Sequence, residues 1–181
     1  MSWNYNAEDL NEELSAGNYL EKSGCYKAKI VSIEEKETSN GGKQVVFKLD
    51  VEGKETTIYH VYTKKDGSLL DFKVRHLNHL LYLNKLTEPS KLKTIEGKEI
   101  GVMLKAKLSL DKKYVNFDIE GFYHLQTGKT AKELKDNLPA KTVNEFKAKY
   151  EAEEPLKREN NPTENHSTTT ETEENDDFPF A

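Results

Sequence analysis

Residues 69–83 have the sequence LLDFKVRHLNHLLYL, and this stretch decides the fold. Its apolar residues recur at intervals of three and four, which is the spacing that lines one face of an α-helix. On both sides of it, apolar and polar residues alternate instead, as they do along strands with one buried face. The sequence therefore predicts one helix of about four turns placed between two groups of strands.

Three strands are expected before this helix, and the first contains a change of face. Ala28 and Ile30 alternate with lysines, after which Val31 and Ile33 carry the apolar character on the opposite parity. An extra residue that shifts the alternation in this way is typical of a β-bulge. We therefore expect a bulged or strongly coiled first strand.

Turn signals separate the next two strands. The sequence Ser-Asn-Gly-Gly at residues 39–42 predicts a tight turn, because glycine adopts positive φ at little cost. In the second strand Val45, Phe47, Leu49 and Val51 share one face. A turn at residues 52–54 leads into a third strand, residues 56–65, that is rich in β-branched and aromatic residues.

The chain after the helix predicts a turn of helix at residues 89–95 and then a two-stranded hairpin. Residues 100–108 alternate cleanly, residues 111–113 form the tight turn, and the fifth strand directs Val115, Phe117 and Ile119 inward. Two short polar helices are expected near residues 130–137 and 142–150. Three strands, a helix and two strands is the order of the five-stranded OB-fold barrel, whereas an SH3-like barrel lacks a helix of this length at this point.

Composition divides the chain further. It is 33% charged and 35% hydrophobic, and the apolar residues are concentrated in the central hundred residues or so. We expect an N-terminal segment with a short helix at 7–15, residues 1–23; an OB-fold domain, 24–126; a helical extension, 127–150; and a disordered acidic tail, 151–181. No stretch resembles a membrane span or a secretory signal, and Cys25 has no partner for a disulfide, so a soluble cytoplasmic protein is expected.

The net charge of -5 conceals two regions of opposite sign. Residues 151–181 carry ten acids against two bases, a net charge of -8, whereas residues 21–150 carry 25 bases against 18 acids, a net charge of +7. A basic body with an acidic tail is typical of proteins that bind nucleic acid, although a solubilising tail on an unrelated domain gives the same pattern.

Catalytic and metal-binding patterns are weak. His76 and His79 share a helix face, but no third ligand has a helpful spacing. Gly128-Lys129-Thr130 resembles the end of a phosphate-binding loop, yet Tyr123 stands where that motif needs glycine. We therefore expect no enzyme activity, no metal and no cofactor.

A surface for single-stranded DNA is better supported. In an OB-fold, strands two and three and the loops joining strands one to two and four to five form the oligonucleotide groove. Aromatic side chains there stack on bases, and lysines neutralise phosphates without reading sequence. Since Tyr59 and Tyr62 have opposite parity, one of the two should leave the interior, and the sequence leaves open which. The candidate DNA-binding residues are Lys43, Lys48, Tyr59, Tyr62, Lys64, Lys65, Lys105, Lys107, Lys112, Lys113 and Tyr114.

The end of the chain has a separate pattern. Residues 151–175 are too polar to fold, and they are followed by Asp176, Asp177, Phe178, Pro179 and Phe180. Two aromatic side chains at the end of such a tail serve no core. Proline stiffens the pair, which lowers the entropy cost of docking, and the acids suit a basic rim. These five residues are the candidate partner-docking tip.

This tip resembles the C-terminal tip of bacterial and phage single-stranded DNA-binding proteins, usually written Asp-Asp-Ile-Pro-Phe. The body is similar to a group of phage proteins long catalogued as a domain of unknown function, through Trp3-Asn4-Tyr5-Asn6 and the Gly-x-Tyr-x-x-x-Ile strand from Gly24 to Ile30. The resemblance implies an OB-fold that coats single strands during phage replication and recombination, in the host cytoplasm, and a tip that docks replication or recombination proteins. This chain departs from the family pattern at Phe178, which replaces Ile, and at Ala181, which follows the final Phe.

An alternative function is a replication or recombination adaptor whose barrel binds protein and contacts DNA only incidentally. The sequence also leaves the oligomeric state open, because a barrel can form homo-oligomers through its edges or through the helices at 130–150.

Overall fold

The structure is a computed structural model that describes residues 19–159. The helix expected at residues 7–15 and the tip at residues 176–180 lie outside the described residues. Within the described part of the chain, no helix is both long and apolar enough to cross a membrane.

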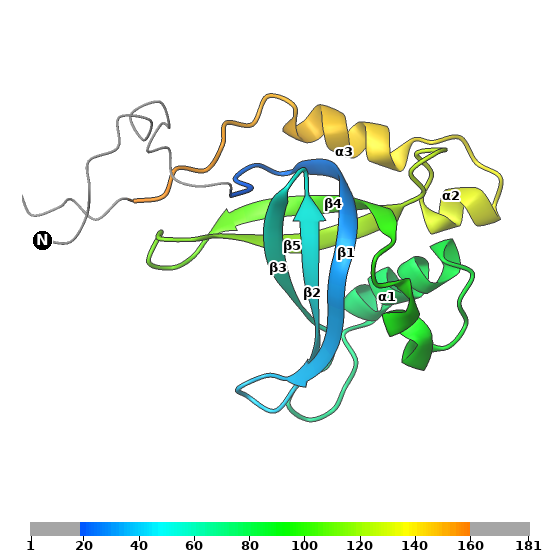
Figure 1. Cartoon of the computed structure of the whole chain (residues 1–181), viewed down its shortest axis with the longest axis horizontal. Helices are drawn as coiled ribbons and strands as arrows, with labels where there is room; N and C mark the ends of the chain where they lie inside the picture. The colour runs from blue at the N-terminus through cyan, green and yellow to red at the C-terminus, as the bar shows by residue number, and fades with distance from the viewer. Residues whose placement is uncertain (1–18, 160–181) are drawn as a thin grey trace, which may run out of the picture.

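Five antiparallel strands form a single sheet (Figure 1). They are β1 (Gly24–Glu37), β2 (Lys43–Val51), β3 (Lys54–Val61), β4 (Glu99–Leu108) and β5 (Val115–Tyr123). Their order in the sheet is β3-β2-β1-β4-β5. The expected mainly β architecture with five strands is therefore confirmed.

The first strand, β1, pairs with two neighbours in succession. Its first six residues pair with β4, and from Lys29 onward it pairs with β2. The register against β2 shifts between Ile30 and Ser32, which leaves Val31 as the extra residue. The bulge expected from the change of parity is confirmed, since Ile30 and Ile33 are buried on the same side while Val31 is exposed.

The sheet is open, in contrast to the closed barrel that the strand order predicts. The two edge strands, β3 and β5, approach one another but form no hydrogen-bonded ladder. A closed barrel requires every strand to pair on both sides. The third strand is also shorter than expected, ending at Val61 instead of residue 65. Thr63 turns away there, and its hydroxyl accepts a hydrogen bond from the Lys43 N–H at 2.7 Å.

The helices are few and short. α1 (Asp71–Leu83) lies between β3 and β4, as predicted, and is followed by the 3₁₀ helix η2 (Pro89–Ile95). After β5 come α2 (Ala131–Lys135) and α3 (Thr142–Tyr150). α1 and η2 close the inner side of the sheet, since Leu80, Leu81, Leu92 and Ile95 join the core formed by Phe47, Leu49, Val102, Ile119 and Phe122.

The last helix, α3, covers part of the outer side of the sheet. Val143 and Phe146 pack against Met103 and Tyr123, beside the first half of β1 (Figure 1). A Cβ at Gly101 would lie 2.4 Å from the Tyr123 ring, so only glycine lets that ring lie across β4.

A buried carboxylate fastens α3 to α2. Glu133 forms a capping box with Thr130 and also accepts hydrogen bonds from the Lys141 and Thr142 N–H groups and from the Thr142 hydroxyl. Burial alone would raise the pKa of Glu133, but these hydrogen bonds outweigh it and lower the pKa to about 2.

Residues 151–159, here called the strap, pack back against the body. Leu156 joins the core, and its N–H donates to the Glu21 carbonyl at 3.0 Å. The Glu159 N–H donates to the Lys112 carbonyl, also at 3.0 Å, in the turn between β4 and β5. Residues of the strap, which composition assigns to the tail, therefore pack against the body. Composition does not predict this packing, because the strap is held by one leucine, Leu156, and by two backbone hydrogen bonds.

Two histidines are buried together between β3 and α1. His60 is 1% and His76 4% exposed, their ring centroids lie 5.6 Å apart, and Phe47 and Phe72 pack against them. The Nδ1 atom of each ring has no hydrogen-bond partner in the described part of the chain. Burial, followed by the charges of His60, Lys73, His79 and Arg75, lowers the pKa of His76 to about 4. Burial also lowers the pKa of His60.

Replacing Glu133 with Gln should reduce the free energy of unfolding by about 2 kcal/mol, because hydrogen bonds to a charged group in a buried site are lost or weakened. The pKa of Glu133 is depressed, so its contribution is complete above the unfolded value of 4.5 and is lost as the pH falls toward 2. Urea unfolding at pH 7 measures the effect. The control is Glu145→Gln on α3, whose carboxylate is exposed; an equal loss in both variants would contradict the assignment.

Protonation of the buried histidines should destabilise the fold below neutral pH. Since the folded pKa of His76 is lowered, its stabilising contribution is complete above pH 6.5 and is lost as the pH falls toward 4. We expect a decrease of about 2 kcal/mol in the free energy of unfolding between pH 7 and pH 4.5 from His76 alone, and this part is lost in His76→Leu, where only His60 remains. Urea titrations at several pH values test this, with the less buried His124→Gln as control. A parallel pH dependence in wild type and His76→Leu would rule the histidine pair out.

Candidate nucleic-acid interface

The second half of the outer side of the sheet is uncovered. We call it the open face: it consists of the outward residues of β1 from Ser32 onward, β2 and β3 (Figure 1). Strand registry places Glu34, Val46 and Tyr59 in one row and Ser32, Lys48 and Thr57 in the next. α3 covers only the other half, so these rows face solvent.

Tyr59 lies on β3, the edge strand of the open face, and is 62% exposed. Its neighbour across the ladder, Val46, is only 6% exposed, so this row of the open face is not uniformly accessible to solvent. Tyr62 lies on the opposite side of the sheet, where it packs against the core and its hydroxyl donates to the Glu35 carboxylate. The alternative that the sequence left open is thus settled in favour of Tyr59 as the outward tyrosine.

Two lysines flank this tyrosine. Lys48 is exposed on β2, one row from Tyr59. Lys36, on β1, forms an ion pair with Glu34 at 2.7 Å, and the hydrogen bond and charge of Lys36 lower the pKa of Glu34. Both side chains of this pair are about half exposed, so the pair is weak and could exchange for a phosphate.

Three more predicted lysines lie near the end of the sheet where β2 begins and β3 ends, although Lys43 has the parity of the inward residue Val45. The β1–β2 turn packs on the chain beyond β3, where Lys43, Lys64 and Lys65 are all exposed. A Cβ at Gly42 would lie 2.5 Å from the Thr63 carbonyl oxygen, so glycine is needed for this close approach. The turn therefore brings residues 20 positions apart into one basic cluster.

The β4–β5 hairpin holds the remaining predicted residues. Tyr114 is 60% exposed, and Lys105, Lys107, Lys112 and Lys113 are exposed as well. Lys107 pairs with Asp118 at 2.7 Å and Lys112 with Glu159 at 2.9 Å. Hydrogen bonds among Ser109, Asp111 and Tyr114 order the turn.

The gap between β3 and β5 connects these groups. Glu55, Thr56 and Thr57 of β3 and residues 114–117 line one small cavity together. The structure thus brings Tyr59, Lys48 and Tyr114 onto one continuous outer surface and leaves Tyr62 away from it. Two residues there, Lys36 and Arg158, were not among the sequence-predicted residues. The parity of the first strand after its bulge could have identified Lys36, but no local signal identifies Arg158.

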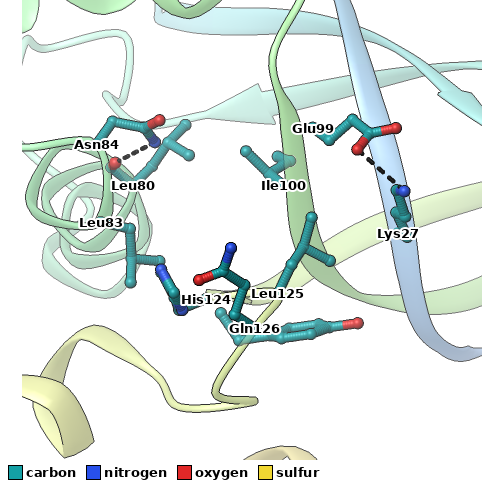
Figure 2. A pocket seen from close by; sticks show the side chains of 10 residues that line it. Lys27, Leu80, Leu83, Asn84, Glu99, Ile100, His124, Leu125 and Gln126 are labelled. Carbon is teal, nitrogen blue, oxygen red and sulfur yellow. Dashed lines mark hydrogen bonds and ion pairs between the residues drawn. The ribbon is translucent and has the colours of Figure 1, made fainter.

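Larger cavities lie elsewhere, and two of them are beside α1. One, of about 590 Å³, is bounded by the C-terminal end of α1, β4 and the loop after β5, where Asn84, Glu99 and His124 surround it (Figure 2). Figure 2 shows that Lys27 is turned toward Glu99, with which it pairs at 3.0 Å. None of the predicted DNA-binding residues lines this cavity. The other, of about 750 Å³, lies between α1, η2 and the inner side of β1 and β2 and includes Tyr62 and Leu69.

Within residues 19–159, no three His, Cys, Asp or Glu side chains gather in a way that could hold a metal ion. The five residues of the predicted docking tip lie outside the described residues. No family model and no curated protein matches this chain.

Proposed function

We propose that this protein binds single-stranded DNA through the open face and the β4–β5 hairpin, without a catalytic step of its own. The observation that carries the proposal is Tyr59, a large aromatic side chain 62% exposed between lysines on a strand whose other face is buried. An exposed tyrosine stabilises no core, whereas its ring offers a platform on which any base can stack.

The tyrosines and lysines of this surface make different kinds of contact with DNA. Tyr59 and Tyr114 stack on bases, which contributes on the order of 1–3 kcal/mol per base. Lys48, Lys105 and Lys113 and the cluster of Lys43, Lys64 and Lys65 neutralise phosphates and release counterions. Because these contacts read no base edges, binding is expected to be independent of sequence and to weaken steeply with salt.

We also propose that the domain is an open member of the OB-fold class. The strand order, the position of α1 between β3 and β4, and the approach of β3 to β5 support this assignment. The same proposal includes a relation to phage single-stranded DNA-binding proteins and a cytoplasmic role in replication or recombination. It also includes recruitment of partner proteins by the docking tip, which consists of Asp176, Asp177, Phe178, Pro179 and Phe180.

A second candidate function, the protein-binding adaptor, is favoured by one observation. The cavity between α1 and η2 has a mainly apolar lining that includes Leu69, Val74 and Leu77, and Leu69 is exposed. Exposed apolar side chains around a cavity are typical of protein-binding surfaces. In this candidate, substitutions around Leu69 impair partner binding, while substitutions on the open face have no effect.

Replacing Tyr59 with Ala should weaken binding to a labelled oligo-dT by about tenfold, because one stacking platform is lost. Fluorescence anisotropy at low salt measures the affinity, and a duplex of equal length tests the preference for single strands. The matched control is Tyr82→Ala on α1, which removes a similarly exposed tyrosine far from the open face. Failure of the wild-type protein to bind oligo-dT at low salt would eliminate the proposal.

Deleting residues 160–181 should tighten DNA binding several-fold and reduce its dependence on salt. These residues carry six acids and no lysine or arginine, and a tethered anionic segment competes with DNA at high effective concentration. The deletion begins after the strap so that the folded body stays complete. Salt titrations of the full and shortened chains measure the effect, and identical curves would disprove competition by the tail.

A further inference from the structure

One cavity on the outer surface lies where the sheet is open. It has a volume of about 290 Å³ and is bounded by β3 on one side and the start of β5 on the other. This is roughly the space of ten water molecules at about 30 Å³ each, which is large enough to admit a single planar base. We call it the seam pocket. Thr57 and Asn116 lie along its walls, and Tyr114 stands at its edge.

The strap supplies a cation to this pocket. The guanidinium of Arg158 lies 4.3 Å from the centroid of the Tyr19 ring, and its side chain is 19% exposed. Its Nε atom is 3.8 Å from the Glu21 carboxylate, which is too long for a hydrogen bond, and has no hydrogen-bond partner in the described part of the chain. The plane of this group is therefore held in place while part of its hydrogen-bonding capacity is unused.

The seam pocket adjoins the open face. Thr57 is two residues before Tyr59 on the same side of β3, so the two are separated by only about 7 Å along the strand. Asn116 is opposite Lys107 in the β4–β5 ladder. The pocket thus lies between Tyr59 and Tyr114, on the path of a DNA strand that stacks on both rings.

We infer that the seam pocket holds one unstacked base of the bound single strand, with Arg158 as a planar platform and Asn116 and Thr57 as polar contacts to the base edge. This inference rests on the proposed function. Guanidinium planes and aromatic rings both stack on bases, and an amide side chain can donate and accept hydrogen bonds at a base edge. Glu55 and Glu21 also border the site, which favours a neutral base over a phosphate inside the pocket.

Two labelled probes of equal length test the inference: oligo-dT and the same oligonucleotide without its bases. Arg158→Ala in the full chain should weaken oligo-dT binding about tenfold and change binding of the abasic probe less than twofold. Arg158→Lys should resemble Arg158→Ala, because lysine keeps the charge but lacks the planar group. The matched control is Lys157→Ala, which removes an exposed charge from the same strap and should reduce binding of both probes slightly and equally.

A second variant covers the case in which Arg158→Ala loosens the strap. Asn116→Ala changes the other wall of the pocket and should weaken oligo-dT binding about threefold, again without affecting the abasic probe. Equal losses on both probes would identify Arg158 as a phosphate contact and overturn the inference. If wild type binds oligo-dT and Tyr59→Ala weakens it, but Arg158→Ala and Asn116→Ala bind normally, the pocket inference alone fails.

Discussion

The bulge at Val31 keeps one side of β1 buried along the whole strand, and the arrangement of the remaining strands depends on it. The first half of the strand pairs with β4 and the second half with β2. In a regular strand without a bulge, Ile33 would point away from the side on which Ile30 is buried, because the two residues are three positions apart and side chains alternate. The bulge thus keeps both halves of the strand facing one core while the sheet coils. The coiling in turn brings β3 toward β5, where the seam pocket lies.

The same strand divides the outer side of the sheet into a covered and an uncovered half. α3 packs over Met103 and Tyr123 and is held there by Glu133, whose carboxylate accepts hydrogen bonds at the start of the helix. The half beyond the bulge has no such cover. Tyr59 and Lys48 are exposed on the half that α3 does not cover.

Regular alternation and periodicity made most of the fold predictable from sequence. The faces of residues 45–51, the bulge and α1 all depend on neighbours a few positions apart. The outward orientation of Tyr59 could not be predicted, because alternation along β3 does not say which of its two faces packs on the core, and only tertiary contacts bury Ile58 and His60. Closure of the sheet depends on contacts between β3 and β5 that no local pattern encodes. The position of Arg158 on the body could not be predicted, because the residues around it in the sequence are mostly acidic.

The strap changes how the charge distribution of the chain is interpreted. Composition places the boundary between basic body and acidic tail at residue 150, but Leu156 and Glu159 bind the body, so Arg158 belongs to the surface near the open face. The acidic residues from 160 onward are therefore tethered at Glu159, beside Lys112 of the β4–β5 hairpin. From that point 22 residues can span at most about 75 Å, which covers the entire open face. A competing anion is most effective when its tether begins next to the site for which it competes.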